Sequence, residues 1–312
     1  MPTASLRTIL VATTLSPDSD TVVALAARWA AAAGARLHVL HAMLLPIEYD
    51  DLPASGPLAP DAYAALETTL RARLDAQLAR LAIGADVLGA AEIVDGTPWR
   101  VIRARAAEIH ADVIVVGATD SDGLFDRLMG STASHVLAGA DRPVLVVRGR
   151  ADGAPARVLA PVDLSPLAGQ AFAAGCALVA AAAGQAGATV TALFVLDERQ
   201  RGAGIQFSPE QMDRFAADEL DRFTGTYAPS APGLTLRNTV RVGEPREAIL
   251  AAAEEGAADL VLIGTHGYTG WDRRVFGSVA ADVMLRCPCS VLILPATGAT
   301  DPPAPQAQPR PA

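Results

Sequence analysis

The chain consists of two similar halves, and this repeat limits its fold more than any other feature of the sequence. The segment VIVVGATDSDGLFDRLMGSTASHVLAGADRPVLVV, from Val113, aligns without a gap with LVLIGTHGYTGWDRRVFGSVAADVMLRCPCSVLIL, from Leu260, at an offset of 147. Near the start of each half, ILVATTLSP from Ile9 matches VLAPVDLSP from Val158. A repeat of about 150 residues has the size of a whole domain, so the sequence predicts a duplicated domain and not a solenoid.

Each half alternates short apolar runs with longer segments of helical periodicity. In the first half we expect strands at Arg7–Thr13, Arg36–His41, Ala91–Asp95, Asp112–Gly117 and Pro143–Arg148, and helices at Asp18–Ala33, Asp61–Ile83, Trp99–His110 and Ser131–Ala140. The second half repeats this order from Arg157 to Pro295. Strands that alternate with helices predict a parallel sheet covered on both faces. The expected fold class is therefore α/β, with two tandem open twisted parallel five-stranded sheets that are Rossmann-like.

The repeat also predicts the domain boundaries. We expect a first domain at 1–149, a linker at 150–156, a second domain at 157–296, and a tail at 297–312 that is rich in Pro and Ala and therefore disordered. The connections at 43–60 and 197–209 are longer than typical loops. They are candidates for lids or partner surfaces, and tolerated insertions are the simpler interpretation.

Charge and composition exclude several classes of function. The net charge of −9 argues against a nucleic-acid partner, because phosphate backbones require basic patches. The sequence contains no lysine, which excludes Schiff-base chemistry and the lysine of P-loops. The amino terminus lacks the pattern of a signal peptide, and no apolar run looks long enough to cross a bilayer. We therefore expect a cytoplasmic protein without a membrane partner.

The three cysteines are too few for a disulfide framework. Cys287 and Cys289 flank a proline and could form a redox or metal pair, but no second Cys/His pair accompanies them. The simpler interpretation is that both are small apolar residues leading into a strand.

A further constraint is the glycine spacing in GTHGYTGWDRRVFGSV, which begins at Gly264 directly after the apolar run DLVLI. Ligands of open parallel sheets bind beyond the carboxyl ends of the strands, and glycine there lets a ligand approach the backbone. Gly277 and Ser278 open the next helix, where free N–H groups and the helix dipole attract anions. Each residue alone is better explained as a turn residue or a helix cap, but the combined spacing after a buried strand predicts a phosphate site made of backbone amides.

With these residues the second half resembles ATP-binding members of the universal stress protein family, which carry Gly, two residues, Gly, nine residues, and then Gly-Ser or Gly-Thr. Gly264, Gly267, Gly277 and Ser278 match that spacing, and the repeat makes the chain similar to a tandem member. The resemblance implies an adenine nucleotide alpha hydrolase-like fold and an ATP site, with Mg²⁺ bound through the nucleotide. It also implies a regulator or sensor in the stress response rather than an enzyme.

The resemblance implies roles for residues outside the glycine motif as well. Asp163, in Pro161-Val162-Asp163, matches the family's Pro-x-Asp, whose aspartate contacts the adenosine part of the nucleotide. A carboxylate suits the nucleoside end, because it accepts hydrogen bonds from sugar hydroxyls and repels phosphates. Capping of the following helix is an alternative role for Asp163, with Ser165 as a competitor. The other positions implied to line the site are Val195, Ile263 and Val279.

The first half departs from the pattern at two positions. Thr14 stands where the second half has Asp163, and Asp120 stands where it has Gly267. A carboxylate at 120 would repel a polyanion in a partly desolvated site. We therefore expect at most one nucleotide site per chain, in the second half. The positions that the first half retains are Gly117, Gly130 and Ser131.

Three charged or titratable residues lie in the glycine loop. Arg273 and Arg274 could reach the phosphates, but exposed loop charges explain them equally well. His266 has no identifiable nucleophile or acid beside it, so we interpret it as a loop residue rather than a base or metal ligand.

Three functional classes remain open. The leading one is an ATP-binding regulator whose conformation or protein partner depends on the nucleotide. The second is a slow ATPase or phosphotransfer enzyme at the same site, and the third is a dimerisation scaffold that binds no nucleotide.

Electron-transfer flavoproteins and ATP pyrophosphatases have related folds. However, the turn Val162-Asp163-Leu164-Ser165 is not the Ser-Gly-Gly-x-Asp-Ser loop that the pyrophosphatases favour.

Members of the family often pair through their last strand. Val144–Val147 and Val291–Leu294 are short and apolar, and they would be exposed edges if left unpaired. We expect them to pair within one molecule as a pseudo-dimer of the two domains. The sequence leaves open whether two chains form a homodimer.

Overall fold

The computed structural model describes residues 6–44, 60–118, 130–149, 153–197, 208–265 and 277–295. Within these ranges the order of strands and helices follows the expectation, with boundaries that differ by a few residues. The tail at 297–312, most of both long connections and the middle of the glycine motif lie outside the described residues.

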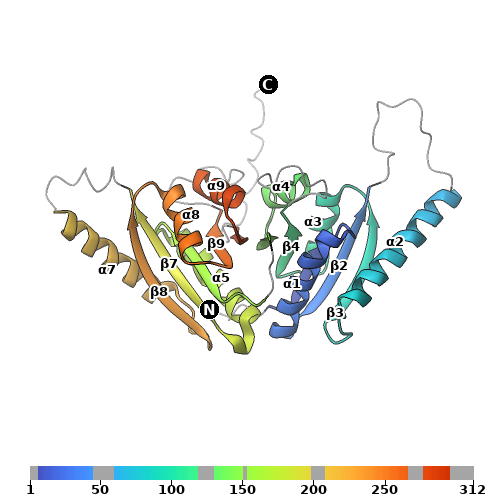
Figure 1. Ribbon diagram of the computed structural model, residues 1–312, viewed down its shortest axis with the longest axis horizontal. Coiled ribbons are helices and arrows are strands. Elements are labelled where there is room, and N and C mark those ends of the chain that lie inside the picture. Colours follow the sequence, from blue (N-terminus) through green and yellow to red (C-terminus); the bar gives the residue numbers. More distant parts are fainter. Residues whose placement is uncertain are drawn as a thin grey trace, which may run out of the picture.

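The two halves contain matching elements (Figure 1). The first half contains β1 (Thr8–Ala12), α1 (Pro17–Ala33), β2 (Arg36–Met43), α2 (Pro60–Arg80), β3 (Leu88–Asp95), α3 (Pro98–Glu108), β4 (Val113–Gly117), α4 (Ser131–Ala138) and β5 (Val144–Val147). The second half contains β6 (Arg157–Val162), α5 (Pro166–Ala183), a short 3₁₀ turn (Gly184–Ala186), β7 (Ala188–Leu196), α7 (Pro209–Tyr227), β8 (Leu234–Val242), α8 (Pro245–Glu255), β9 (Leu260–Gly264), α9 (Ser278–Arg286) and β10 (Ser290–Leu294).

The strands form one sheet in the order β3-β2-β1-β4-β5-β10-β9-β6-β7-β8. Within each half the recorded pairs are parallel. In the first half, β2 and β3 lie on one side of β1, whereas β4 and β5 lie on the other. β6 has the same central place in the second half. This reversal of strand order is typical of Rossmann-like folds, so the predicted α/β class is confirmed.

The two five-stranded sheets are joined edge to edge into a single sheet of ten strands. β5 pairs with β10 in antiparallel orientation, with Leu145 opposite Leu292 at the centre. All residues of both strands are buried. The expected pairing of these segments within one molecule is therefore confirmed, and it removes two apolar edges that would otherwise be exposed.

Apolar side chains form one core on each face of this sheet. The first core lies under α1, α2, α5 and α7 and includes Trp29 and Leu220. The second lies under α3, α4, α8 and α9 and includes Ile102 and Val283. Both cores contain residues of both halves, so each continues across the junction. Each large aliphatic side chain buried there stabilises the fold by about 1.5–3 kcal/mol.

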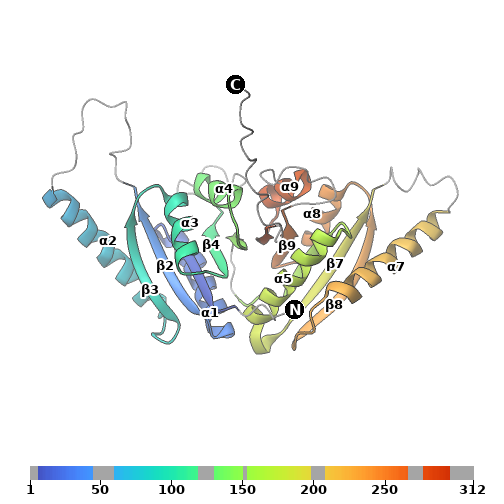
Figure 2. The ribbon, with the colours of Figure 1, turned by 180° about the vertical axis from the view of Figure 1, so that it is seen from behind.

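The halves are related by an approximate twofold axis. Turning the molecule by 180° about the vertical axis exchanges them, and α1 lies beside α5 at the junction in both views (Figure 2). Backbone conformation repeats as well. Leu15 and Leu164 have φ angles of +60° and +62°, and His110 and Ala257 have φ angles of +50° and +42°. The duplication seen in the sequence therefore extends to unusual backbone conformations.

Among the described residues, one helical segment, α5 with the 3₁₀ turn that follows it (Pro166–Ala186), is long and apolar enough to cross a membrane by length and composition alone. The expectation that no run reaches that length was wrong for this segment. α5 packs against α1 and β9, and its buried residues, such as Phe172 and Cys176, belong to the core. Its apolar composition therefore follows from its place between the two halves.

α5 approaches β9 so closely that only glycine fits at one position. A Cβ atom on Gly175 would lie 2.1 Å from Cδ1 and 2.6 Å from Cγ of Leu262. Leu262 is itself buried and has little room to move. At the matching positions, the first half carries Ala26 in α1 and Val115 in β4, both fully buried. A larger helix residue thus accompanies a smaller strand residue, so the two positions compensate in volume.

We expect Gly175→Ala to lower the free energy of unfolding. The substitution gains up to about 1 kcal/mol of helix propensity, but overpacking a buried site costs about 1–3 kcal/mol. Urea denaturation measures the difference. Gly225→Ala in α7 is the matched control, because a Cβ atom there meets nothing within 4 Å. The control should gain stability from helix propensity alone.

The compensation itself is tested by the double variant Gly175→Ala with Leu262→Val, which copies the first half. It should be more stable than the sum of the two single changes predicts, because contacting positions couple. Simple additivity of the two effects would show that the positions do not compensate.

Candidate functional site

The residues singled out in the second half gather at the carboxyl ends of β6, β7 and β9. β6 pairs with β7 as far as Val162 opposite Phe194, so Asp163 follows beside Val195. Gly264 ends β9 and pairs with Leu294 of β10. These strand ends lie at the same edge, because the three strands are parallel members of one half.

The sheet opens between β6 and β9. The recorded pairing of these strands stops at Leu159 opposite Val261, whereas β6 remains paired with β7 to its end. Pro161 has no N–H group with which to extend the ladder. In the first half, β1 pairs with β4 one position further, to Val11 opposite Val115. The opening lies where the strand order reverses, and such switch points are where open α/β sheets bind ligands.

The turn after β6 is shaped by Asp163 and Ser165. The Oδ1 atom of Asp163 accepts a hydrogen bond from the N–H group of Ser165 at 3.0 Å, and the Oγ atom of Ser165 accepts one from Ala168 at 3.1 Å. Ser165 is therefore the N-cap of α5, and the alternative that Asp163 caps this helix is wrong. Leu164 between them adopts a left-handed conformation, which costs free energy and clusters at functional sites.

The loop after β9 is closed at its base by one hydrogen bond, from the N–H group of Gly277 to the carbonyl of Thr265 at 3.0 Å. The first half repeats it from Gly130 to Ala118 at 2.8 Å. Gly277 has φ −55° and ψ 140°, and an added Cβ atom would lie 3.6 Å from the Thr265 carbonyl oxygen. Within the described part of the chain, neither backbone conformation nor packing requires glycine there.

α9 begins at this point without a side-chain cap. Ser278 is exposed in its first turn, and Val279 is half-buried beside it. The N–H groups at the start of an uncapped helix are able to bind an anion, which the helix dipole favours. The start of α9 is thus suited to a phosphate or a carboxylate.

The structure describes nine of the ten predicted site residues. Pro161, Val195 and Gly264 are half-buried, while Val162 and Ile263 are buried. Gly267 lies outside the described residues, as do His266, Arg273, Arg274 and the first-half residue Asp120. In the described ranges no group of three or more His, Cys, Asp or Glu side chains is placed to hold a metal ion.

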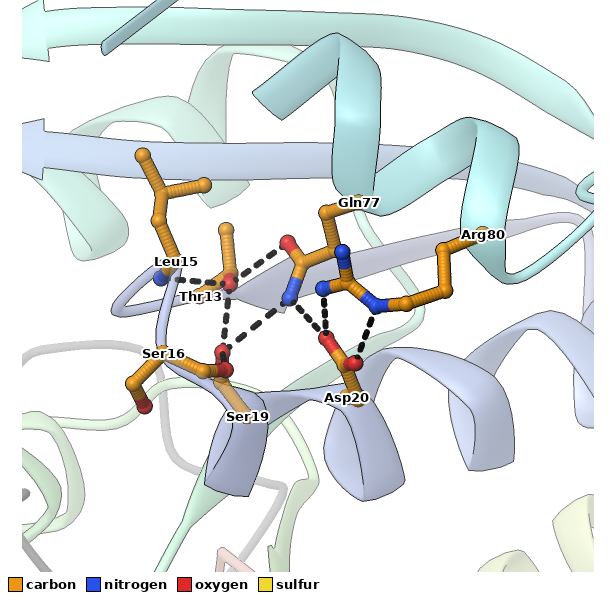
Figure 3. Close-up of polar contacts among 7 residues, drawn as sticks. All are labelled: Thr13, Leu15, Ser16, Ser19, Asp20, Gln77 and Arg80. Atoms are coloured by element: carbon orange, nitrogen blue, oxygen red, sulfur yellow. Dashed lines mark hydrogen bonds and ion pairs between the residues drawn. The ribbon is translucent and has the colours of Figure 1, made fainter. Parts of the chain in front are cut away.

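The matching turn of the first half is filled by a polar cluster, which Figure 3 shows. The hydroxyl of Thr13 donates to Oε1 of the fully buried Gln77 at 2.9 Å and is hydrogen-bonded to the hydroxyl of Ser19, also at 2.9 Å. The amide nitrogen of Gln77 donates to Ser19 at 3.1 Å and to Asp20 at 2.7 Å. Arg80 donates twice to the Asp20 carboxylate, at 2.7 and 2.9 Å. The cluster links the end of β1 and the start of α1 to α2.

In the second half, aromatic rings make the corresponding contact between α5 and α7. Gly169 stands where the first half has Asp20, and the ring of Tyr227 in α7 packs against it so closely that a Cβ atom would lie 2.5 Å from the ring. Tyr227 contacts Phe223, which in turn contacts Phe172, with ring centroids 5.1 and 5.8 Å apart. No polar cluster is therefore needed beside Asp163 to hold α7.

Sequence reasoning did not find the Thr13–Gln77 cluster or the left-handed turn at Leu164. The only signal for the cluster was that Thr13 and Ser19 replace Val162 and Ala168 of the other half. Because Gln77 is far away in the sequence, its partners could not be identified before the fold was known.

Comparison with known proteins adds independent evidence. A family model described as "Universal stress protein family" matches residues 5–148 and again residues 156–295. A universal stress protein from Methanothermobacter thermautotrophicus is 28% identical over 114 residues, which cover 33% of this chain and 74% of that protein. Another from Methanocaldococcus jannaschii is 37% identical over 62 residues, which cover 20% of this chain and 36% of that protein.

Solved structures support the fold over nearly the whole chain. The crystal structure of a universal stress protein from Archaeoglobus fulgidus is similar with a TM-score of 0.64 and 19% identity, covering 93% of this chain and 98% of that one. A putative universal stress protein from Pseudomonas aeruginosa gives a TM-score of 0.60 and 18% identity, covering 94% of this chain and 95% of that one. At this level of identity the similarity establishes the fold alone.

We expect Gln77→Ala to lower the free energy of unfolding by about 1–3 kcal/mol, because it leaves buried hydroxyls of Thr13 and Ser19 without the amide that they contact. Thermal or urea denaturation measures this loss. Gln170 lies exposed on α5 and serves as the matched control. Gln170→Ala should change stability little, and an equal effect of both substitutions would contradict a role of the buried amide.

The Asp20–Arg80 pair should make stability depend on pH. The hydrogen bond from Arg80 is the main cause that holds the pKa of the Asp20 carboxyl below its usual value, against the opposing effect of burial. The pair therefore stabilises the fold above the ordinary carboxyl pKa of about 4, and this contribution disappears as pH falls through the lowered pKa. The difference in unfolding free energy between the parent and Arg80→Gln should accordingly be small at neutral pH and vanish in acid. A difference that grows in acid would contradict this.

Proposed function

The chain belongs to the universal stress protein family, and we propose that its second half binds an adenine nucleotide, ATP with Mg²⁺, at the carboxyl ends of β6 and β9. One observation carries the proposal. The sheet opens between these two strands at the switch point, with Asp163 after one strand and Gly264 at the end of the other. Sites of this kind take ligands that span a crevice, with one end at each strand.

The phosphates are assigned to the side of β9. Gly264, Gly277 and Ser278 there match the glycine spacing of ATP-binding members of the family. Gly277 supports the assignment, because its backbone is one that any residue adopts and because, among the described residues, an added Cβ atom would meet only the Thr265 carbonyl oxygen, at 3.6 Å. Close approach of a ligand is a physical reason for glycine that remains at such a position. The uncapped start of α9 would add N–H donors to the phosphate oxygens.

The nucleoside is assigned to the side of β6 and β7. A carboxylate accepts several hydrogen bonds at once, so Asp163 can hold the turn through Ser165 and also accept from a ribose hydroxyl. Val195, which follows beside it on β7, and Pro161 offer apolar contacts to the base. The opposite ends of the site thus differ in charge preference, as the two ends of a nucleotide do.

We infer a regulatory rather than an enzymatic role for this site. Hydrolysis needs a base or a residue that orients water within hydrogen-bond reach of the phosphate. No acid–base pair or nucleophile can be identified beside the glycine motif in the sequence. Nucleotide binding would then select a conformation or a protein partner by differential affinity, which is how a ligand shifts an equilibrium.

Isothermal calorimetry with ATP and Mg²⁺ tests the proposal. We expect about one ATP per chain, and a loss of affinity of at least about tenfold, or about 1.4 kcal/mol, in Gly277→Val. The valine side chain would occupy the phosphate path. Gly267→Asp, which copies Asp120 of the first half, should weaken binding through charge repulsion.

Gly130→Val is the matched control, because Gly130 makes the same loop-closing hydrogen bond in the first half. It should leave the affinity and stoichiometry unchanged. An equal loss of affinity in Gly130→Val would mean that the first half binds the nucleotide or that both substitutions damage the fold. Absence of binding by the parent chain would contradict the proposal. Phosphate release under saturating ATP separates the regulator from the slow ATPase.

A further inference from the structure

Two cysteines outside the proposed nucleotide site lie close together just before β10. The sulfur atoms of Cys287 and Cys289 are 3.5 Å apart, and both thiols are free. Cys287 ends α9 as its C-cap residue, and Ser290 after Cys289 opens the strand that joins the two halves. A bend at Pro288 turns both side chains to the same side of the chain.

A half-buried guanidinium accompanies the two thiols. Arg148, at the end of β5, donates from Nη2 to the carbonyl of Met284 at 2.8 Å, and its backbone N–H group donates to Oγ of Ser290 at 3.2 Å. Its Nε atom is buried without a partner among the described residues. Burial lowers the pKa of Arg148, whereas the charges of the two cysteine sulfurs favour its protonated form.

Electrostatics makes one of the two thiols easier to ionise. A hydrogen bond from Cys289 lowers the pKa of the Cys287 thiol, and the positive charge of Arg148 acts in the same direction, whereas burial and the charge of Glu254 oppose them. The same hydrogen bond is the main cause that raises the pKa of the Cys289 thiol, and burial and the charge of a Cys287 thiolate act in the same direction. Of the two thiols, Cys287 is therefore the one that ionises first.

The pair opens on a cavity of about 380 Å³ at the junction of the two halves. Cys289, Arg148 and Trp29 of α1 line it, together with residues 153–155 of the linker and the residues on either side of it. Trp29 is only 2% exposed, and its buried indole N–H group has no partner in the described part of the chain. The cavity is thus large enough for small polar molecules to reach Cys289.

We propose that Cys287 and Cys289 form a reversible dithiol–disulfide site whose oxidant is a small peroxide that enters through this cavity. Three features carry the proposal: the sulfur–sulfur distance, the guanidinium at the pair, and the opening on the side of Cys289. Rotation of the side chains has to bring the sulfur atoms from 3.5 Å to about 2 Å.

The reaction balances with the peroxide as the only co-reactant. One thiolate attacks a peroxide oxygen, the O–O bond breaks, and the leaving hydroxide takes up a proton to become water. The sulfenic acid that results is attacked by the second cysteine, which loses its proton, and a second water leaves as the S–S bond forms. The attacking thiolate is that of Cys287, whose sulfur lies 3.5 Å from the Cys289 sulfur that lines the cavity. Two thiols are oxidised and one peroxide is reduced.

The third cysteine is an internal control. Cys176 is fully buried in α5, and burial raises its pKa to about 12. A protonated thiol is a poor nucleophile, so Cys176 should not react while the chain is folded.

Treatment of the reduced, full-length chain with a small excess of hydrogen peroxide, followed by alkylation after unfolding and intact-mass measurement, tests the proposal. We expect the monomer to lose two hydrogen atoms and to keep one of its three alkylatable thiols, and dithiothreitol to restore all three. Peptide mapping of the oxidised parent chain should place the bond between Cys287 and Cys289. This mapping does not depend on whether any variant folds.

Cys287→Ser and Cys289→Ser should each abolish the loss of two hydrogens, whereas Cys176→Ser should retain it. The proposal is overturned if the parent gains only oxygen atoms, if the disulfide joins two chains, or if the hydrogen loss survives in Cys289→Ser. Because none of these readouts involves ATP, the result is independent of the proposed nucleotide site.

Discussion

The antiparallel pairing of β5 with β10 is the contact on which the rest of the structure depends. A parallel five-stranded sheet ends in an apolar edge strand, and such an edge must be covered. Here each half covers the edge of the other, so that both strands are buried throughout. Both cores then run across the junction, and α1 packs against α5 over it. The cavity beside Cys289 also exists only because the halves meet.

Much of this fold could be predicted from the sequence. Alternating apolar runs and helical segments predicted the order of the elements, and the repeat predicted that both halves share it, because these are local signals. The continuous sheet depended on non-local pairing, and only the resemblance to a family suggested it. The close contact of Gly175 with Leu262 could not be predicted, because it depends on the distance between α5 and β9.

The candidate site, too, could be predicted only in part. The strand ends and the glycine spacing predicted that Asp163 and Gly264 lie at one edge of the sheet, because the ends of parallel strands coincide. The role of Ser165 as the helix cap was left open, since Asp163 and Ser165 are both good capping residues. The buried Gln77 could not be recognised, because its partners come from β1 and α1, some sixty residues away.

The two halves hold their outer helices by different means. α2 is held to α1 by hydrogen bonds such as that from Gln77 to Asp20, whereas α7 is held to α5 by the packing of Tyr227 against Gly169. In a homodimer of identical subunits one codon specifies both copies of a position, so such a difference cannot arise. A tandem chain has two codons for each position. One copy can therefore accumulate changes that would disable a ligand site if they occurred in both, while the shared sheet keeps the altered copy folded.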